Sequence, residues 1–190
     1  MLTKEVYTMR VIAGQFKGRQ LKSVPTHKTR PTTDKVKEAV FHGIGPFFDG
    51  GRALDLFAGS GGLGIEAISR GADSCVFVDQ QQKAVQTVYE NIKLLDIEDR
   101  VEVFRTDAKR AIKAAGKRGL EFEYIFLDPP YKKFSYKDLM EALLQNDLVA
   151  DDAIIVCEHD ASEDIPEEAG RLKLQKTDFY GSNIGVSIFQ

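Results

Sequence analysis

Residues 52–79 read RALDLFAGSGGLGIEAISRGADSCVFVD, and this stretch decides the fold. Residues 52–58 form an apolar run that is typical of a buried strand, whereas residues 62–71 have helical spacing and end at Gly71. Residues 74–79 form a second apolar strand. A buried strand, a crossover helix and another buried strand predict a parallel βαβ unit.

The same alternation continues to the end of the chain. Further helices are predicted over 30–48, 81–96, 108–119 and 136–146, and further strands over 101–107, 124–128, 153–159, 171–181 and 183–190. The last two strands are joined by a turn at 181–183 with no helix between them, so one of them enters the sheet antiparallel. We therefore predict an α/β, Rossmann-like fold with a doubly wound, mostly parallel seven-stranded sheet and an antiparallel C-terminal hairpin strand.

Composition fits one globular domain with a small appendage, because the chain has 190 residues, 43% hydrophobic and 29% charged. Cys75 and Cys157 lie in apolar runs and are expected to be buried thiols. The three histidines never stand at ligand spacing with cysteine, so no metal site is expected. No apolar run is long enough for a membrane span and no secretory signal is recognisable, so we expect a cytoplasmic protein without a membrane partner, acting as a monomer.

Charge is distributed unevenly along the chain. Residues 1–37 hold nine Lys/Arg against two acids, a balance of +7, while the remainder carries 17 basic and 27 acidic residues, a balance of −10. This asymmetry predicts a basic arm at 1–30 that binds a polyanion, ahead of a domain at 31–190. The pattern of residues 10–24 around two glycines predicts a short β-hairpin that carries four candidate RNA-binding residues, Arg10, Lys17, Arg19 and Lys22. The alternative is a solvated tail.

Four successive strands each end in or near an aspartate: Asp55, Asp79, Asp107 and Asp128. In a doubly wound sheet, ligands bind outside the carboxyl ends of the strands, so these acids are predicted to line one rim. Aspartate also caps helices, which is the structural alternative for each of them.

The segment 59–64 satisfies the pattern G-x-G-x-x-G between a strand and a helix, and Asp79 follows Gly59 by twenty residues. This context predicts a nucleoside-cofactor site in which Asp79 binds the ribose hydroxyls. NAD fits less well than S-adenosylmethionine, because Asp55 would repel a pyrophosphate but suits a cationic amino group. No acid–base pair suited to hydride transfer follows in the sequence.

Residues 127–131 read LDPPY, directly after a predicted strand. A carboxylate and a carbonyl held rigid by two prolines can accept both hydrogens of an exocyclic amine, and the Tyr131 ring can stack on the base. The base would leave its helix or loop to reach this pocket. The alternative is an ordinary loop turn.

These motifs together resemble class I S-adenosylmethionine-dependent methyltransferases that act on amino nitrogens. The N-terminal segment, MRVIAGQFKGRQLKSVP…TRPTTDKVKEAVF, with LDLFAGSG and DPPY, resembles the RsmD family of small-subunit ribosomal RNA guanine-N2 methyltransferases from about residue 9 to the C-terminus. The resemblance implies methylation of guanine 966 (RNA numbering) of 16S rRNA in the small subunit or its assembly intermediate. It implies S-adenosylmethionine as the cofactor.

The resemblance also implies roles for particular residues. The amine pocket would be formed by Asp128, Pro129, Pro130 and Tyr131. The cofactor would be bound by Arg30, Thr32, Thr33, Asp55, Phe57, Gly59, Ser60, Gly61, Asp79, Gln80, Asp107 and Ala108.

Three alternative functions remain open at this point. A DPPY loop orients an amine without distinguishing guanine N2 from adenine N6, so a DNA adenine methyltransferase or another nucleic-acid amino-methyltransferase is possible. It is disfavoured because only about 50 residues precede the core. A non-catalytic RNA-binding assembly factor is disfavoured by the four intact acids. An NAD-dependent oxidoreductase is the most distant alternative.

Overall fold

The structure is a computed structural model, which describes residues 9–24 and 33–190. Its helices are α1 (Asp34–Ile44), α2 (Gly62–Ser69), α3 (Gln82–Leu95), α4 (Ala108–Lys117) and α5 (Tyr136–Gln145), with a 3-10 turn at Glu98–Arg100. Its strands are β1 (Met9–Arg10), β2 (Gln20–Leu21), β3 (Arg52–Asp55), β4 (Ser74–Asp79), β5 (Val101–Arg105), β6 (Phe122–Leu127), β7 (Val149–Asp160), β8 (Glu168–Ala169), β9 (Leu172–Tyr180) and β10 (Ile184–Phe189).

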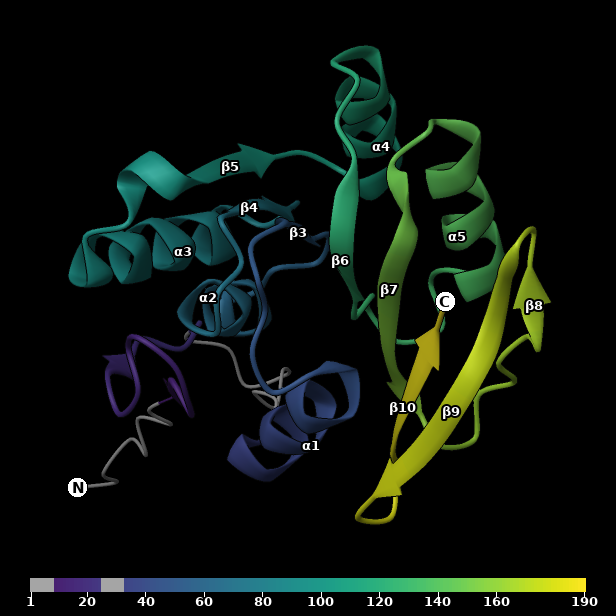
Figure 1. Ribbon diagram of the computed structural model, residues 1–190, viewed down its shortest axis with the longest axis horizontal. Coiled ribbons are helices and arrows are strands. Elements are labelled where there is room, and N and C mark those ends of the chain that lie inside the picture. The colour runs from purple at the N-terminus through teal and green to yellow at the C-terminus, as the bar shows by residue number, and fades with distance from the viewer. Residues whose placement is uncertain (1–8, 25–32) are drawn as a thin grey trace.

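The central sheet has the strand order β5-β4-β3-β6-β7-β10-β9-β8 (Figure 1). Strands β3 to β7 pair in parallel, and β10 is antiparallel to both β7 and β9. The seven predicted strands are thus confirmed, and the two-residue β8 adds a short edge to β9. The order reverses beside β3, which places the predicted ligand site at the carboxyl ends of β3, β4 and β6.

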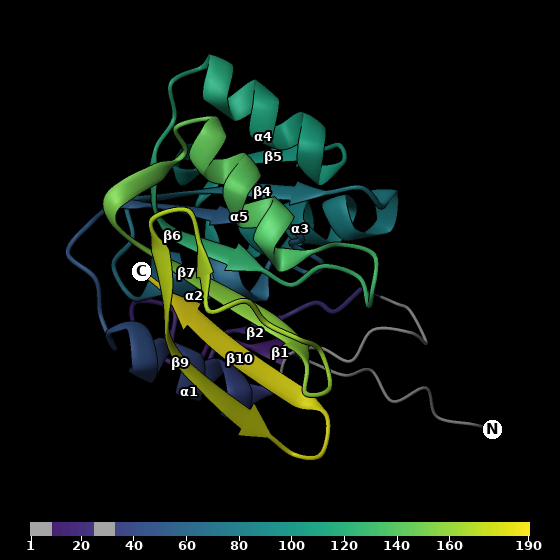
Figure 2. The ribbon, with the colours of Figure 1, turned by 90° about the vertical axis from the view of Figure 1, so that its right-hand side faces the viewer.

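Helices cover both faces of this sheet (Figure 2). On one face α1, α2 and α3 pack their apolar side chains, among them Phe41, Ile65 and Val88, against the strands. On the other face α4 and α5 contribute side chains such as Ile112 and Leu139 to a second cluster. Both sheet faces are therefore buried, as the continuous apolar strands predict.

Several helix starts follow from single residues. Thr33 precedes α1 in an extended conformation, and its hydroxyl accepts the Val36 amide at 3.3 Å. The side chains of Asp107 and Ser135 cap α4 and α5 in the same way. Each of these side chains satisfies one amide that the first turn of a helix leaves unbonded.

The predicted hairpin is present at the N-terminus, where β1 and β2 pair antiparallel with Met9 opposite Leu21. Met9, Val11 and Leu21 are buried in the same cluster as α1 and α2, so this part of the chain packs on the domain. The predicted boundary at residue 30 lies outside the described residues and stays a prediction. Among the described residues, no helix is long and apolar enough to cross a membrane.

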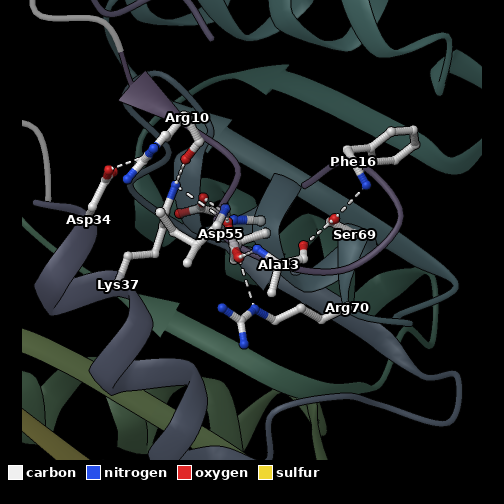
Figure 3. Close-up of polar contacts among 11 residues, drawn as sticks. Arg10, Ala13, Phe16, Asp34, Lys37, Asp55, Ser69 and Arg70 are labelled. Atoms are coloured by element: carbon white, nitrogen blue, oxygen red, sulfur yellow. Dashed lines mark hydrogen bonds and ion pairs between the residues drawn. The ribbon is translucent and has the colours of Figure 1, made fainter. Parts of the chain in front are cut away.

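Polar contacts fasten this hairpin to the domain, and Figure 3 shows Arg10 and Ala13 of the hairpin beside Lys37 and Arg70. Glu66 of α2 is fully buried and accepts the amides of Ile12 and Ala13, each at 3.0 Å. It also pairs with Arg70 at 2.8 Å and with Lys37 at 3.4 Å. The Lys37 ammonium additionally donates to the carbonyl of Arg10.

The network brings two cations and two amides from three segments onto one carboxylate. Burial lowers the pKa of Lys37, and the Glu66 charge opposes that shift. Removing the carboxylate would leave two buried cations without their counter-ion, which is far more costly than losing an exposed pair.

We therefore expect Glu66→Ala to lower the free energy of unfolding by about 3–5 kcal/mol, measured by urea denaturation. The matched control is Glu102→Ala, because Glu102 is exposed and pairs with Arg118 at 2.8 Å across the surface. An equal effect of the two substitutions would show that the Glu66 network does not hold the hairpin and α1 together.

Candidate active site

The four predicted aspartates lie at the carboxyl ends of neighbouring strands. Asp55 and Asp79 are the last residues of β3 and β4, Asp107 lies two residues beyond β5, and Asp128 follows β6 directly. Asp55 pairs in register with Phe77 of β4 and Phe126 of β6, so it lies where the strand order reverses. The predicted rim of acids is confirmed as an arrangement in space.

Asp55 is buried, and its carboxylate accepts the amide of Gly64 at 3.0 Å. Burial raises the pKa of Asp55 to about 7; the Gly64 hydrogen bond opposes this rise, whereas the charge of Asp79 adds to it. A cationic group bound beside Asp55 would favour the ionised form. This environment fits the ammonium of an amino-acid-like ligand.

Asp79 is partly buried and orders the backbone around it. One of its oxygens accepts the amide of Gly59 at 2.9 Å, and the other accepts the amide of Gln81 at 2.8 Å. Each carboxylate oxygen can accept a second hydrogen bond, so both remain able to bind hydroxyls of a ligand. Gln80, beside Asp79, is exposed at the same rim.

The glycines of the loop between β3 and α2 serve different purposes. A Cβ added at Gly59 would meet nothing within 4 Å, whereas one at Gly64 would lie 2.4 Å from the Phe77 ring and 2.7 Å from the sulfur of Cys75. Gly61 precedes α2 in the left-handed conformation, with φ of 83°. Gly64 therefore allows α2 to approach β4, while Gly59 leaves open space against which a ligand can lie, as nucleoside binding requires.

Ser60 ties this loop to the basic arm and to α3. Its hydroxyl accepts the Val24 amide at 2.9 Å, and the Asn91 side-chain amide donates to the Ser60 carbonyl at 2.9 Å. Asn91 also bonds both backbone groups of Lys22. The sequence analysis missed Asn91, because a single amide inside an amphipathic helix gives no signal.

The remaining predicted cofactor residues have structural contacts of their own. Phe57 packs edge-on against Phe134, with ring centroids 5.1 Å apart. Asp107 caps α4 by accepting the Arg110 amide at 3.0 Å, and Ala108 is buried as the first residue of that helix. The predicted adenine contact of Asp107 and Ala108 stays a prediction, as does the cofactor role of Thr33, which caps α1. Arg30 and Thr32 lie outside the described residues.

The DPPY segment forms a loop at the rim between β6 and α5. The Tyr131 side chain is 59% exposed, and the Lys132 ammonium lies 5.4 Å from the centre of its ring. The carboxylate of Asp160 has a lowered pKa, chiefly because of its hydrogen bonds to Ser162, and the nearby Tyr131 hydroxyl adds to this shift. The ring is thus available for stacking.

Asp128 is exposed at the rim, directly after the end of β6. Desolvation and the neighbouring carboxylates of Glu158 and Asp55 raise its pKa well above the usual value. Contact with solvent weakens the effect of desolvation on Asp128. The neighbouring carboxylates of Glu158 and Asp55 therefore remain as the cause of its raised pKa. These carboxylates therefore repel one another, and a bound cation would relieve that repulsion and favour their ionised forms.

Glu158 is an acid at the rim that the sequence analysis did not select. It lies near the end of β7, in the expected apolar strand 153–159, and so adds a fifth acid to the same edge of the sheet. The signal was present in the sequence, because an acid near the end of a parallel strand was the criterion used for the other four.

The predicted RNA-binding residues are mostly engaged within the molecule. Arg10 pairs with Asp34 at 2.6 Å, Lys22 pairs with Glu90 at 2.8 Å, and the Arg19 guanidinium donates to the Leu94 carbonyl at 2.7 Å. Lys17 is exposed on the hairpin loop and has no ion-pair partner within residues 9–24 and 33–190. Their binding of RNA stays a prediction.

The sheet order, the glycine loop and the rim of acids define a class I S-adenosylmethionine-dependent methyltransferase. Residues 9–189 match the model of the family described as "Conserved hypothetical protein 95", and the chain belongs to this family. In the part of the chain that the structure describes, no group of three potential ligands could hold a metal ion.

Relatives with assigned names support this membership. The chain is 52% identical over 182 residues to the "Putative rRNA methyltransferase YlbH" of Bacillus subtilis, covering 96% of this chain and 98% of that protein. It is 30% identical over 158 residues to the "Ribosomal RNA small subunit methyltransferase D" of Escherichia coli K12, covering 83% and 78%. A solved structure, "Putative methyltransferase yhhF from Escherichia coli", superposes with a TM-score of 0.80 at 29% identity, covering 96% and 97%.

The open rim around Asp79 leads to a prediction about the cofactor. We expect Asp79→Ala to weaken S-adenosylmethionine and S-adenosylhomocysteine binding by about 1.5–3 kcal/mol, because charge-assisted hydrogen bonds to ribose are lost. Isothermal titration calorimetry measures both affinities.

Asp79→Asn separates the two roles of this side chain, since it keeps one oxygen for a backbone amide but removes the charge. Asp178→Ala is the matched control, because Asp178 is an acid on β9, a strand far from β4 in the sheet order. Unchanged affinity in a folded Asp79→Ala protein would remove Asp79 from the cofactor site.

Proposed function

We propose that this protein transfers a methyl group from S-adenosylmethionine to the exocyclic N2 amine of a guanine in 16S ribosomal RNA of the small subunit. The observation that carries the proposal is the placement of the DPPY loop at the end of β6, on the rim that also holds Asp55 and Asp79. The names of the relatives from Bacillus subtilis and Escherichia coli support ribosomal RNA as the substrate.

The residues of the rim divide into two groups in this proposal. Asp55, Asp79 and the open backbone at Gly59 bind the cofactor, whose sulfonium supplies an activated methyl group. Asp128 and the Pro129 carbonyl accept the two hydrogens of the amine and so direct its lone pair toward the methyl group. Positioning of this kind can account for most of the rate, because the leaving group needs no activation.

The negative charge of the pocket assists the same step. The amine becomes cationic as it accepts the methyl group, and the carboxylates of Glu158 and Asp55 lie close enough to Asp128, the proposed partner of the amine, to raise its pKa. Fixed charges aimed at a developing cation stabilise the transition state more than the ground state. Asp128 needs no formal role as a base.

Tyr131 would stack on the base after it has left its helix or loop. Its ring is exposed, so a base can lie against it. Lys132, beside the ring, and Lys133 are exposed and can contact the adjoining phosphates.

The deciding experiment is transfer of labelled methyl groups to four substrates: unmodified small subunits, naked 16S rRNA, large-subunit RNA and duplex DNA. We expect label in small-subunit RNA, recovered as N2-methylguanine after nuclease digestion. Label in DNA adenine would favour the adenine methyltransferase, and cofactor binding without transfer to any substrate would favour a non-catalytic assembly factor.

Variants of the DPPY loop belong to the same experiment. Asp128→Ala is expected to abolish transfer while leaving affinity for S-adenosylhomocysteine nearly intact, because Asp128 is assigned to the amine. Tyr131→Phe should be mild and Tyr131→Ala severe, since stacking needs the ring. Near-normal turnover of Asp128→Ala would contradict the amine pocket.

A separate prediction concerns the surface that binds RNA. The basic arm carries Lys17, Arg19 and Lys22 on and beside its hairpin, whereas residues 38–190 are net acidic. If all three contact phosphates, changing them to Ala should flatten the slope of log affinity against log salt by about two and weaken binding at low salt. The measurement is a salt titration of RNA or subunit binding.

Lys113, Lys117 and Lys173 provide the matched control, because all three are exposed and their loss removes the same charge elsewhere on the domain. S-adenosylmethionine affinity should barely change in either triple variant. Identical salt slopes for the wild type and the hairpin variant would place the RNA surface elsewhere, with Lys132 and Lys133 as the next candidates.

A further inference from the structure

The structure places a second carboxylate beside the one assigned to the amine. Strands β6 and β7 are parallel and paired with Leu127 opposite Cys157, and the residues that follow this last pair are Asp128, just beyond β6, and Glu158 of β7. Adjacent strands lie about 4.8 Å apart, which makes these two acids immediate neighbours at the rim. The influence of Glu158 on the pKa of Asp128 is consistent with this proximity.

The side chain of Glu158 lies on the face of the sheet that α1 and α2 cover, and not on the face that α4 and α5 cover. Cys157 belongs to the cluster under α4 and α5, whereas Val156 and Val186 belong to the cluster under α1 and α2. Because side chains alternate along a strand, Glu158 lies on the α1 and α2 face together with Val156. Its residue is partly exposed, so solvent or a ligand can reach it.

The backbone that carries Glu158 is held on several sides. The Tyr136 hydroxyl donates to the Glu158 carbonyl at 2.6 Å, and Glu158 pairs in register with Val186 of β10. The neighbouring His159 is buried, and its ring contacts the Asp160 carbonyl and the Ser187 hydroxyl, each at 2.8 Å. A carboxylate on such a rigid strand can select a ligand by geometry.

Guanine and adenine differ at the position next to the reactive amine. In guanine, the N2 amine is flanked by N1–H, a second donor, whereas in adenine the N6 amine is flanked by N1, an acceptor. An ionised carboxylate is an acceptor only, and donors bonded to it favour the ionised form. Two adjacent carboxylates therefore match the two adjacent donors of guanine once the base is bound. An adenine in the same orientation would place its N1 lone pair against the second carboxylate.

We infer that Glu158 accepts the N1–H of the target guanine while Asp128 and the Pro129 carbonyl hold its N2 amine, so that the pair selects guanine over adenine. This inference rests on the proposed function. It explains how guanine is distinguished from adenine, which the DPPY loop alone cannot do because it orients the exocyclic amine of either base. Glu158 is then a specificity-determining residue that contacts the base.

The test uses 2-aminopurine, which keeps the reacting N2 amine but has an acceptor at N1. Small-subunit RNA with guanine or 2-aminopurine at the methylated position is made by ligating a synthetic fragment and is assembled into subunits. Methyl transfer to each RNA is compared for the wild type, Glu158→Gln and Glu158→Ala, and calorimetry with S-adenosylhomocysteine verifies that each variant is folded.

The wild type should prefer guanine to 2-aminopurine by about 10- to 100-fold, because one hydrogen bond is replaced by two facing acceptors. Glu158→Gln should shift this ratio toward 2-aminopurine by roughly tenfold or more, since its amide can donate to N1. Glu158→Ala should lose the preference for guanine without gaining activity on 2-aminopurine. Glu141→Gln, the same change on α5, should leave the ratio as it is in the wild type.

Two results would overturn the inference. A wild-type protein that methylates 2-aminopurine as well as guanine does not read N1, and this result needs no variant to fold. A Glu158→Gln protein with the wild-type ratio would show that another group reads N1. Both differ from failure of the proposed function, in which the wild type would not methylate guanine in small-subunit RNA at all.

Discussion

The rest of the structure depends on the buried carboxylate of Glu66. It stands on α2, the helix that follows the glycine loop, and it bonds the amides of Ile12 and Ala13 from the N-terminal hairpin. Through Lys37 it also holds α1. A buried carboxylate must be compensated by donors and cations, so these three segments cannot separate without leaving charge unpaired in the interior. The hairpin is thereby fixed in relation to the glycine loop, and the Val24 bond to Ser60 extends this connection to the rim. The described part of the basic arm is therefore bonded to the glycine loop that borders the candidate site.

How much the sequence reveals depends on whether the information is local. The alternation of strands and helices, the acids at the strand ends and the G-x-G-x-x-G loop are local patterns, and the structure confirms them. The role of Glu66 is not local, because its hydrogen-bond partners at residues 12 and 13 are more than 50 positions away. In the sequence Glu66 reads as one polar residue of a helix, and only the packing of the hairpin makes it buried. The engagement of Arg19 and Lys22 with α3 could not be predicted for the same reason.

The acids of the rim also show that residues with the same sequence pattern can have different structural roles. All four aspartates were selected by one criterion, yet they have different surroundings. Asp107 caps α4, as an aspartate before any helix can do. Asp55 is buried against one amide and has a pKa raised to about 7, so its charge is poorly compensated in the absence of a cation. Poor compensation is the sign of a group arranged for a ligand, whereas a satisfied cap has a sufficient structural reason. By this measure Asp55 and Asp128 are stronger candidates for ligand residues than Asp107.

Concentrating acids at one rim creates a difficulty for a protein that binds RNA, because phosphates are repelled by the same charges that suit a cationic cofactor. Acidic and basic side chains lie in different places. Acidic side chains line the carboxyl ends of the strands, whereas basic side chains lie on the hairpin beside α2 and α3 and next to Tyr131. In the proposed function, only the target nucleobase needs to enter the rim, and a nucleobase carries no charge. A neutral base that presents adjacent N–H donors is attracted by carboxylates, whereas one that presents an acceptor is repelled. In the proposed function, the same carboxylates that would bind the sulfonium cofactor and the cationic amine therefore also favour donor-rich edges, and the edge of guanine that carries N1–H and the N2 amine is such an edge.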